Sequence, residues 1–231
     1  MSTRQVGRRT SISLALIALW ISSCSTSTDP TNDSPAPAVP EGARVWDFED
    51  GRPGEVPPGF VSDLTGGGGP VKWQVVDVGD APSGSKVVAQ LSDDRTNADV
   101  DVSVSFKTIS GEVDASGGLV FRYQDKGNFY VVRANSLERN VVAYKTEDGA
   151  RSNIGVRGKG DAHGVKADVP HRQWNTLRVI AKGKLIDVFL NDRKLFDVED
   201  ETLRGPGRVG LWTKADAVTQ FDALTVKSLD G

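Results

Sequence analysis

Residues 117–135 read GGLVFRYQDKGNFYVVRAN, and their pattern predicts a β-hairpin. Hydrophobic and polar residues alternate on both sides of Lys126 and Gly127. A glycine at this place tolerates the positive φ that a two-residue hairpin turn requires. A three-residue loop would put Arg133 among the hydrophobic residues of the preceding strand, so the hydrophobic pattern favours the two-residue turn.

The two-residue turn predicts a definite register for the two arginines of this hairpin. Arg122 is expected opposite Val131, and Val120 opposite Arg133. In this register both arginines share the outer face of the sheet as diagonal neighbours, with Asn135 close by. Two cations at that distance repel each other unless an anionic or hydrogen-bonding group lies between them.

Two interpretations of this face remain open at the level of sequence. The outer face of any sandwich strand is polar, and the stem of an arginine covers apolar neighbours. Alternatively, Arg122, Arg133 and Asn135 bind a glycan, because guanidinium groups suit hydroxyls and carboxylates. Tyr144 on the neighbouring strand and Phe129 are then candidates to stack on a sugar ring.

Alternation with a period of two continues through the rest of the chain. DVDVSVSF, residues 99–106, places its valines and phenylalanine on one face and Asp99, Asp101 and two serines on the other. WNTLRVIAKGKLIDVFLNDRKLFDV, residues 174–198, predicts two or three further strands. No apolar stripe of helical period exceeds about two turns. The sequence therefore predicts an all-β protein, an antiparallel two-sheet jelly-roll sandwich of about ten to thirteen strands.

The N-terminus predicts export. Residues 1–23 combine three arginines with an apolar segment that is too short to span a bilayer comfortably. The following Ile-Ser-Ser-Cys resembles a bacterial lipobox, which predicts a lipoprotein signal peptide and lipidation of Cys24. An ordinary secretory peptide with an incidental cysteine is the alternative. Cys24 is the only cysteine of the chain, and exported proteins generally avoid a lone thiol, which favours the lipoprotein.

Composition divides the remainder into two parts. Residues 24–43 are rich in Ser, Thr and Pro and predict a disordered linker. Residues 44–229 predict one domain of a size that suits a β-sandwich. The formal charge of −3 argues against a nucleic-acid partner, which requires a basic surface. We expect a bacterial cell-envelope protein, periplasmic or on the cell surface, that is held to a membrane by its lipid anchor.

Four motifs carry a resemblance to a known superfamily. They are WDFEDG at 46–51, the hairpin above, RQWNTLRVIAKGKLIDVFLND at 172–192, and GRVGLW followed by FDALTV near the C-terminus. With these motifs the domain resembles the concanavalin A-like lectin/glucanase superfamily of jelly-roll sandwiches, which includes the laminin G-like modules. Within it, the chain is loosely similar to the bacterial 3-keto-disaccharide hydrolase domains.

The resemblance implies a structural Ca²⁺ between the first and last strands. Glu49 and Asp222 occupy the matching places, with a backbone carbonyl near Gly51. Calcium prefers six or more oxygen ligands, and only these two side chains are evident. Both carboxylates are alternatively exposed groups of a turn and a strand.

The resemblance also raises the question of catalysis. Glucanases of the superfamily carry Glu-x-Asp-x-x-Glu on one strand, and this sequence lacks that motif. A hydrolase or lyase of modified disaccharides would need another acid or base, for which Glu112, Asp114 and Glu138 are the candidates. A further possibility is a proton relay between the two histidines, His163 and His171.

Three functions follow as alternatives. The first is glycan binding without catalysis, through Arg122, Arg133, Asn135 and Tyr144. The second is hydrolysis or elimination of 3-keto disaccharides in the same groove. The third is a purely architectural module of the cell envelope. Whether the protein is an enzyme stays open at this stage.

Overall fold

The computed structural model describes residues 39–62, 64, 72–84, 86–87 and 97–230. The predictions of a signal peptide and of a lipidated Cys24 lie outside these residues. All fourteen regular elements of the described segments are β-strands. No helix in these segments has the length and apolar character needed to cross a lipid bilayer.

The first sheet has six antiparallel strands in the order β1-β14-β4-β10-β11-β12. Their bounds are β1 Arg44–Trp46, β14 Val218–Ser228, β4 Val100–Ser110, β10 Asn175–Lys182, β11 Leu185–Leu190 and β12 Arg193–Glu199. A separate small pair consists of β2, Val76–Asp77, and β3, Lys86–Val87.

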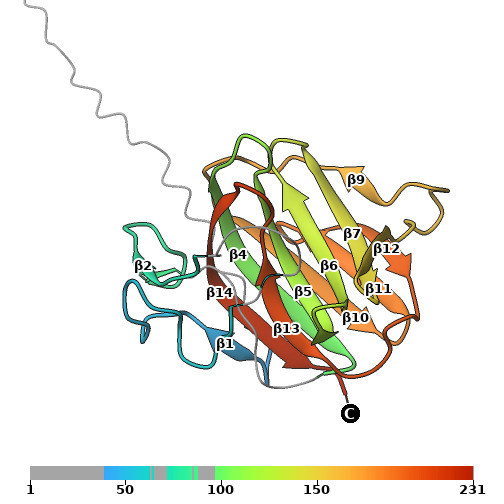
Figure 1. Ribbon diagram of the computed structural model, residues 1–231, viewed down its shortest axis with the longest axis horizontal. Helices are drawn as coiled ribbons and strands as arrows, with labels where there is room; N and C mark the ends of the chain where they lie inside the picture. Colours follow the sequence, from blue (N-terminus) through green and yellow to red (C-terminus); the bar gives the residue numbers. More distant parts are fainter. Residues whose placement is uncertain (1–38, 63, 65–71, 85, 88–96, 231) are drawn as a thin grey trace, which may run out of the picture. The chain divides into compact units, whose positions relative to one another are not determined.

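The second sheet has the order β13-β5-β6-β7-β8, and β9 also pairs with β7. Its strands are β13 Arg208–Trp212, β5 Ser116–Asp125, β6 Asn128–Asn135, β7 Asn140–Glu147, β8 Ala150–Asn153 and β9 Gly164–Lys166. In Figure 1 this sheet faces the viewer, and β10 and β11 of the first sheet lie behind it. The predicted antiparallel two-sheet sandwich is confirmed.

The core lies between the two sheets and follows the alternation of the sequence. In β4, Val100, Val102 and Val104 are buried, whereas the intervening Asp101 and Ser103 are partly exposed. The second sheet contributes the side chains of its inner face to this core, among them Leu119 and Phe121 of β5 and Tyr130 and Val132 of β6. Burial of each such side chain contributes about 1.5–3 kcal/mol, which is the main source of cohesion in a chain with one cysteine.

The β5–β6 hairpin has the predicted turn but not the predicted register. Asp125 pairs with Asn128, which confirms the two-residue turn at Lys126 and Gly127. The register then shifts between Phe121 and Asp125, so that Arg133 lies opposite Gly118 rather than Val120. The shift coincides with Arg122, whose backbone has a φ of 47°. A bulge of this kind re-aims the side chain at the irregular position.

The bulge turns Arg122 toward the opposite sheet, so the prediction that both arginines share the outer face is wrong. Arg122 is 1% exposed. Its guanidinium donates hydrogen bonds to the carbonyls of Ala98 and Gly183, at 2.6 and 2.7 Å, beside the ends of β4 and β10. It also donates to the Leu203 carbonyl at 3.3 Å and to Asp99 at 3.2 Å. Arg122 therefore joins the two sheets at one end of the sandwich.

A close backbone approach supports the bulge. A Cβ at Gly207, just before β13, would lie 2.3 Å from the carbonyl carbon of Arg122. Only glycine permits the chain to pass that near. β13 shows its own register shift where it pairs with this part of β5.

Candidate functional site

The outer face of the second sheet, which is the face turned away from the first sheet, carries an apolar cluster of its own. Its buried members are Val120, Phe129, Val131, Val142 and Tyr144, and Tyr123 and Trp212 pack against them. These residues do not belong to the main core. The outer face of an antiparallel sheet is ordinarily polar, so an apolar cluster there marks a candidate binding surface.

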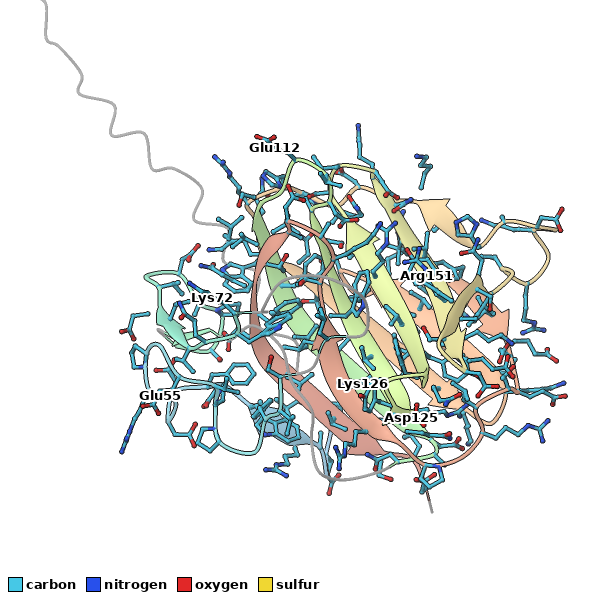
Figure 2. All side chains as sticks on the ribbon, in the orientation of Figure 1. Glu55, Lys72, Glu112, Asp125, Lys126 and Arg151 are labelled. Carbon is cyan, nitrogen blue, oxygen red and sulfur yellow. The ribbon has the colours of Figure 1, made fainter. Side chains whose placement is uncertain are left out.

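A cavity of about 370 Å³ opens over this cluster. We call it the Trp212 cavity; its lining includes Phe129, Val131, Tyr144, Arg151, Trp212 and Lys214. The volume lies within the range of about 300–1,000 Å³ that is usual for small-molecule sites. Arg151, on β8, is labelled beside β7 in Figure 2. The cavity thus combines an aromatic and aliphatic floor with two cationic side chains.

A row of directly paired residues crosses the outer face beside this cavity. Trp212 of β13 pairs with Gly118 of β5, Gly118 pairs with Arg133 of β6, and Arg133 pairs with Val142 of β7. Gly118 bears no side chain, so β5 contributes only main chain to this row between Trp212 and Arg133. A Cβ at Gly118 would lie 2.9 Å from the Val132 carbonyl oxygen and 3.3 Å from the Arg133 Cβ.

Arg133 lies at the centre of this row and is 5% exposed. Its Nε donates a hydrogen bond to the Tyr144 hydroxyl, and its Nη2 donates to Glu138 at 2.8 Å. The bond from Arg133 holds the pKa of Glu138 below its usual value. Burial raises the pKa of Tyr144, so its hydroxyl stays protonated at neutral pH. The Nη1 of Arg133 is buried and has no hydrogen-bond partner within the described part of the chain.

Two further cations, Arg151 and Lys214, lie near Arg133 and its partners Tyr144 and Glu138. Arg151 is exposed, and its guanidinium lies 5.1 Å from the centre of the Tyr144 ring, at cation–π distance. Lys214 Nζ lies 3.6 Å from Oδ2 of the buried Asp114, which accepts a hydrogen bond from Ser116 on its other oxygen. That separation makes an ion pair but not a hydrogen bond. Arg151 and Lys214 line the cavity, whereas Asp114 does not belong to its described lining.

The structure brings two of the four predicted ligand-binding residues together. Arg133 and Tyr144 are in direct contact, and Asn135 lies on the same strand as Arg133. The side-chain oxygen of Asn135 accepts hydrogen bonds from the backbone amides of Leu137 and Glu138, so this residue shapes the β6–β7 turn. Arg122, the fourth, points between the sheets and is removed from the candidate site.

Sequence reasoning missed Arg151, Lys214 and Trp212 as residues of the candidate site. β13 lies beside β5 only because the fold places a strand from near the C-terminus at that edge. Arg151 follows a tight turn in a short exposed strand, which gives no signal in the hydrophobic pattern. The one signal in the sequence was a tryptophan at the end of a strand with a lysine two residues after it.

The three candidate catalytic acids and the two histidines differ in burial and in their hydrogen-bond partners. Asp114 is 1% exposed and Glu138 pairs with Arg133, whereas Glu112 is exposed. His171 Nδ1 lies 3.2 Å from both Thr108 Oγ1 and Ser136 Oγ, whereas His163 lines a smaller cavity of about 220 Å³. The described structure has no hydrogen bond between the two histidines, so it does not assemble the relay.

The two predicted calcium ligands, Glu49 and Asp222, both lie against the segment of Ser83 and Gly84. Both carboxylate oxygens of Asp222 accept hydrogen bonds from Ser83, at 2.7 Å from its amide and 2.5 Å from its hydroxyl. A Cβ at Gly84 would lie 2.4 Å from the carboxyl group of Glu49. Burial raises the pKa of Asp222. Within the part of the chain that is described, no three His, Cys, Asp or Glu side chains gather to hold a metal. The calcium site stays a prediction.

Comparison with known proteins adds the family context. Residues 57–227 match the family described as the 3-keto-alpha-glucoside-1,2-lyase-like domain. The carbohydrate-binding module CBM66 from Bacillus subtilis superposes with a TM-score of 0.55 at 22% identity, over 68% of this chain and 92% of that chain. A galectin from Caenorhabditis elegans, LEC-6, superposes with a TM-score of 0.46 at 14% identity, over 60% of this chain and 89% of that chain. No curated protein matches the sequence. At 22% identity the match to the Bacillus subtilis module shows a shared fold alone.

Proposed function

The chain belongs to the family of 3-keto-alpha-glucoside-1,2-lyase-like domains, and from this membership we propose that it binds a carbohydrate in the Trp212 cavity. The resemblance expected from the sequence is thereby confirmed. The observation that carries the proposal is the cavity itself, an apolar aromatic floor with polar groups around it on the outer face of a sandwich. The carbohydrate-binding module of Bacillus subtilis, which shares the fold, supports the same class of ligand.

The chemistry of the cavity suits a sugar. A sugar ring has apolar C–H faces that pack on aromatic rings, and Trp212 and Tyr144 offer such rings. Its hydroxyls both donate and accept hydrogen bonds. Thr146 and Thr213 line the cavity and do the same, and Arg151 and Lys214 donate.

The proposal is tested with a glycan array and a pair of tryptophan variants. Trp212→Ala should abolish the binding signal, because the indole lines the cavity and offers a ring on which a sugar packs. Trp174→Ala is the matched control, since its indole donates a hydrogen bond to the Asp80 carbonyl and does not line this cavity. Binding that survives in Trp212→Ala, or that is absent from the unmodified protein, would refute the proposal.

The family name supports a second candidate, an elimination reaction on a 3-keto glucoside. Such a reaction removes the proton at C2, next to the ketone, and expels the group at C1. Glu138 and Asp114 are the carboxylates near the cavity, and Lys214 is the nearby cation that can stabilise the developing enolate. Incubation with a 3-keto disaccharide and detection of released sugar tests this candidate. Activity that persists in Glu138→Gln and in Asp114→Asn would exclude both carboxylates as the base.

We also propose that the domain acts in the bacterial cell envelope, on a lipid anchor attached to Cys24. The sequence features of residues 1–43 support this location. A linker rich in Ser, Thr and Pro would hold the cavity away from the membrane surface, where it can reach a glycan.

A further inference from the structure

We propose that the Trp212 cavity selects a uronic acid, a sugar that carries a carboxylate, over a neutral sugar of the same shape. This inference rests on the proposed function and names the class of ligand for the same site. It departs from the neutral glucoside in the family name, so it concerns this chain in particular.

The first observation is the set of charges that line the cavity. Arg151 and Lys214 contribute two cations, and no carboxylate belongs to the described lining. The whole chain has 31 acidic and 28 basic residues, so acids are the commoner charge elsewhere. Two cations without an acid in a partly apolar cavity attract an anionic ligand.

The second observation is that Arg151 has no acidic partner among the residues that the structure describes. Its one electrostatic contact in the described structure is with the Tyr144 ring, at 5.1 Å. Glu147 in the same hairpin lies 3.8 Å from Lys145 instead. The planar guanidinium of Arg151 therefore keeps its donors for a ligand, and its fork matches the two oxygens of a carboxylate.

The neighbouring cations have partners already, which assigns the ligand carboxylate to Arg151. The Arg133 side chain is buried and bonded to Glu138 at 2.8 Å, so an acid of the protein balances its charge. Lys214 lies 3.6 Å from Asp114 and is 41% exposed, so it is balanced only in part. Arg133 also donates to the Tyr144 hydroxyl and thereby fixes the ring over which Arg151 lies.

The experiment compares two oligosaccharide probes with the same linkage, oligogalacturonate and the neutral oligogalactose. Calorimetry on the purified full-length protein measures both affinities at low and at high salt. We expect the uronate probe to bind about tenfold more tightly, as a charge-assisted hydrogen bond at a partly exposed site predicts. The preference should shrink at high salt, because screening weakens exposed charge pairs.

Two arginine variants separate the inference from the proposed function. Arg151→Gln should remove the preference, so that within this variant the uronate probe binds no more tightly than the neutral probe, because glutamine keeps an N–H donor for a hydroxyl but carries no charge. Arg139→Gln is the matched control, an exposed arginine of the same sheet region that pairs with Asp168 and does not line the cavity. Equal affinity for both probes, or a preference that survives in Arg151→Gln, overturns this inference alone. Failure to bind any glycan overturns the proposed function as well.

Discussion

Arg122→Met is expected to destabilise the folded protein by about 3–5 kcal/mol, the usual loss when one partner of a buried charged network is removed. The guanidinium is 1% exposed and donates to three backbone carbonyls and to Asp99. Methionine keeps most of the apolar stem, so the loss is mainly polar. After the substitution, the carbonyls of Ala98, Gly183 and Leu203 have no donor in this place.

The magnitude follows from those contacts. A hydrogen bond from a charged donor contributes about 1.5–3 kcal/mol, and the cost of losing it is full only where water is excluded. The bond to Leu203 is buried, whereas the bonds to Ala98 and Gly183 are partly buried, so water compensates part of their loss. Asp99 keeps a hydrogen bond from the Gly183 amide at 2.8 Å. The total loss of unfolding free energy is therefore expected near the lower end of the sum for three hydrogen bonds from a charged donor.

Urea denaturation followed by tryptophan fluorescence measures the effect. With an m-value of about 2 kcal/mol per molar urea, the midpoint should fall by roughly 1.5–2.5 M. Arg139→Met, whose ion pair with Asp168 is 70% and 80% exposed on its two sides, should leave the midpoint unchanged. A shift below about 0.5 M in Arg122→Met would refute the assigned role. Glycan affinity of the folded variant should be unaltered, because Arg122 does not line the cavity.

Four other predictions follow. Arg133→Ala should weaken glycan binding in calorimetry and lower the melting temperature by several degrees, because the buried guanidinium also anchors Tyr144; unchanged affinity would contradict it. Burial raises the pKa of Asp222, so the folded protein holds that proton more tightly than the unfolded chain, and the associated stability is lost as pH rises above about 3.8 through the folded pKa. Asp222→Asn should therefore gain stability relative to the unmodified protein as the pH rises above about 3.8 in urea titrations, and the opposite trend would count against it. If Glu49 and Asp222 hold Ca²⁺, chelation should lower the melting temperature and added Ca²⁺ should restore it, whereas no shift would reject the site. Cys24→Ser should abolish metabolic labelling with fatty acid and release the protein from the membrane fraction; retained label would place the lipid elsewhere.

The alternation of hydrophobic residues was sufficient to predict the strands and the class of fold. In β4 and β10 each buried valine or leucine alternates with a polar or partly exposed residue, and the observed pairing of Val104 with Leu177 keeps both on one face. The turn at Lys126 and Gly127 was also predicted correctly, since its chemistry is local. These features depend on near neighbours in the sequence, which is why a single sequence contains them.

The position of Arg122 could not be predicted, because the bulge breaks the assumption behind a period of two. A charged residue between apolar neighbours looks the same whether it faces solvent or turns to satisfy carbonyls at the end of the other sheet. Those carbonyls, of Ala98, Gly183 and Leu203, come from segments far apart in the sequence. The same limit applies to Trp212 and Lys214, whose place beside β5 depends on sheet order.

Gly118 has a consequence for how this scaffold changes its ligand. The backbone carbonyl of Val132 occupies the space that a larger residue would need, so the depth of the surface between Trp212 and Arg133 is set by main chain rather than by side chains. A change of ligand would therefore have to come from the walls, above all Arg151 and Lys214, which stand on a short exposed strand and on the segment that follows β13. Proteins that share this floor can then diverge in preference by exchanging two surface cations, with no repacking of the sandwich beneath.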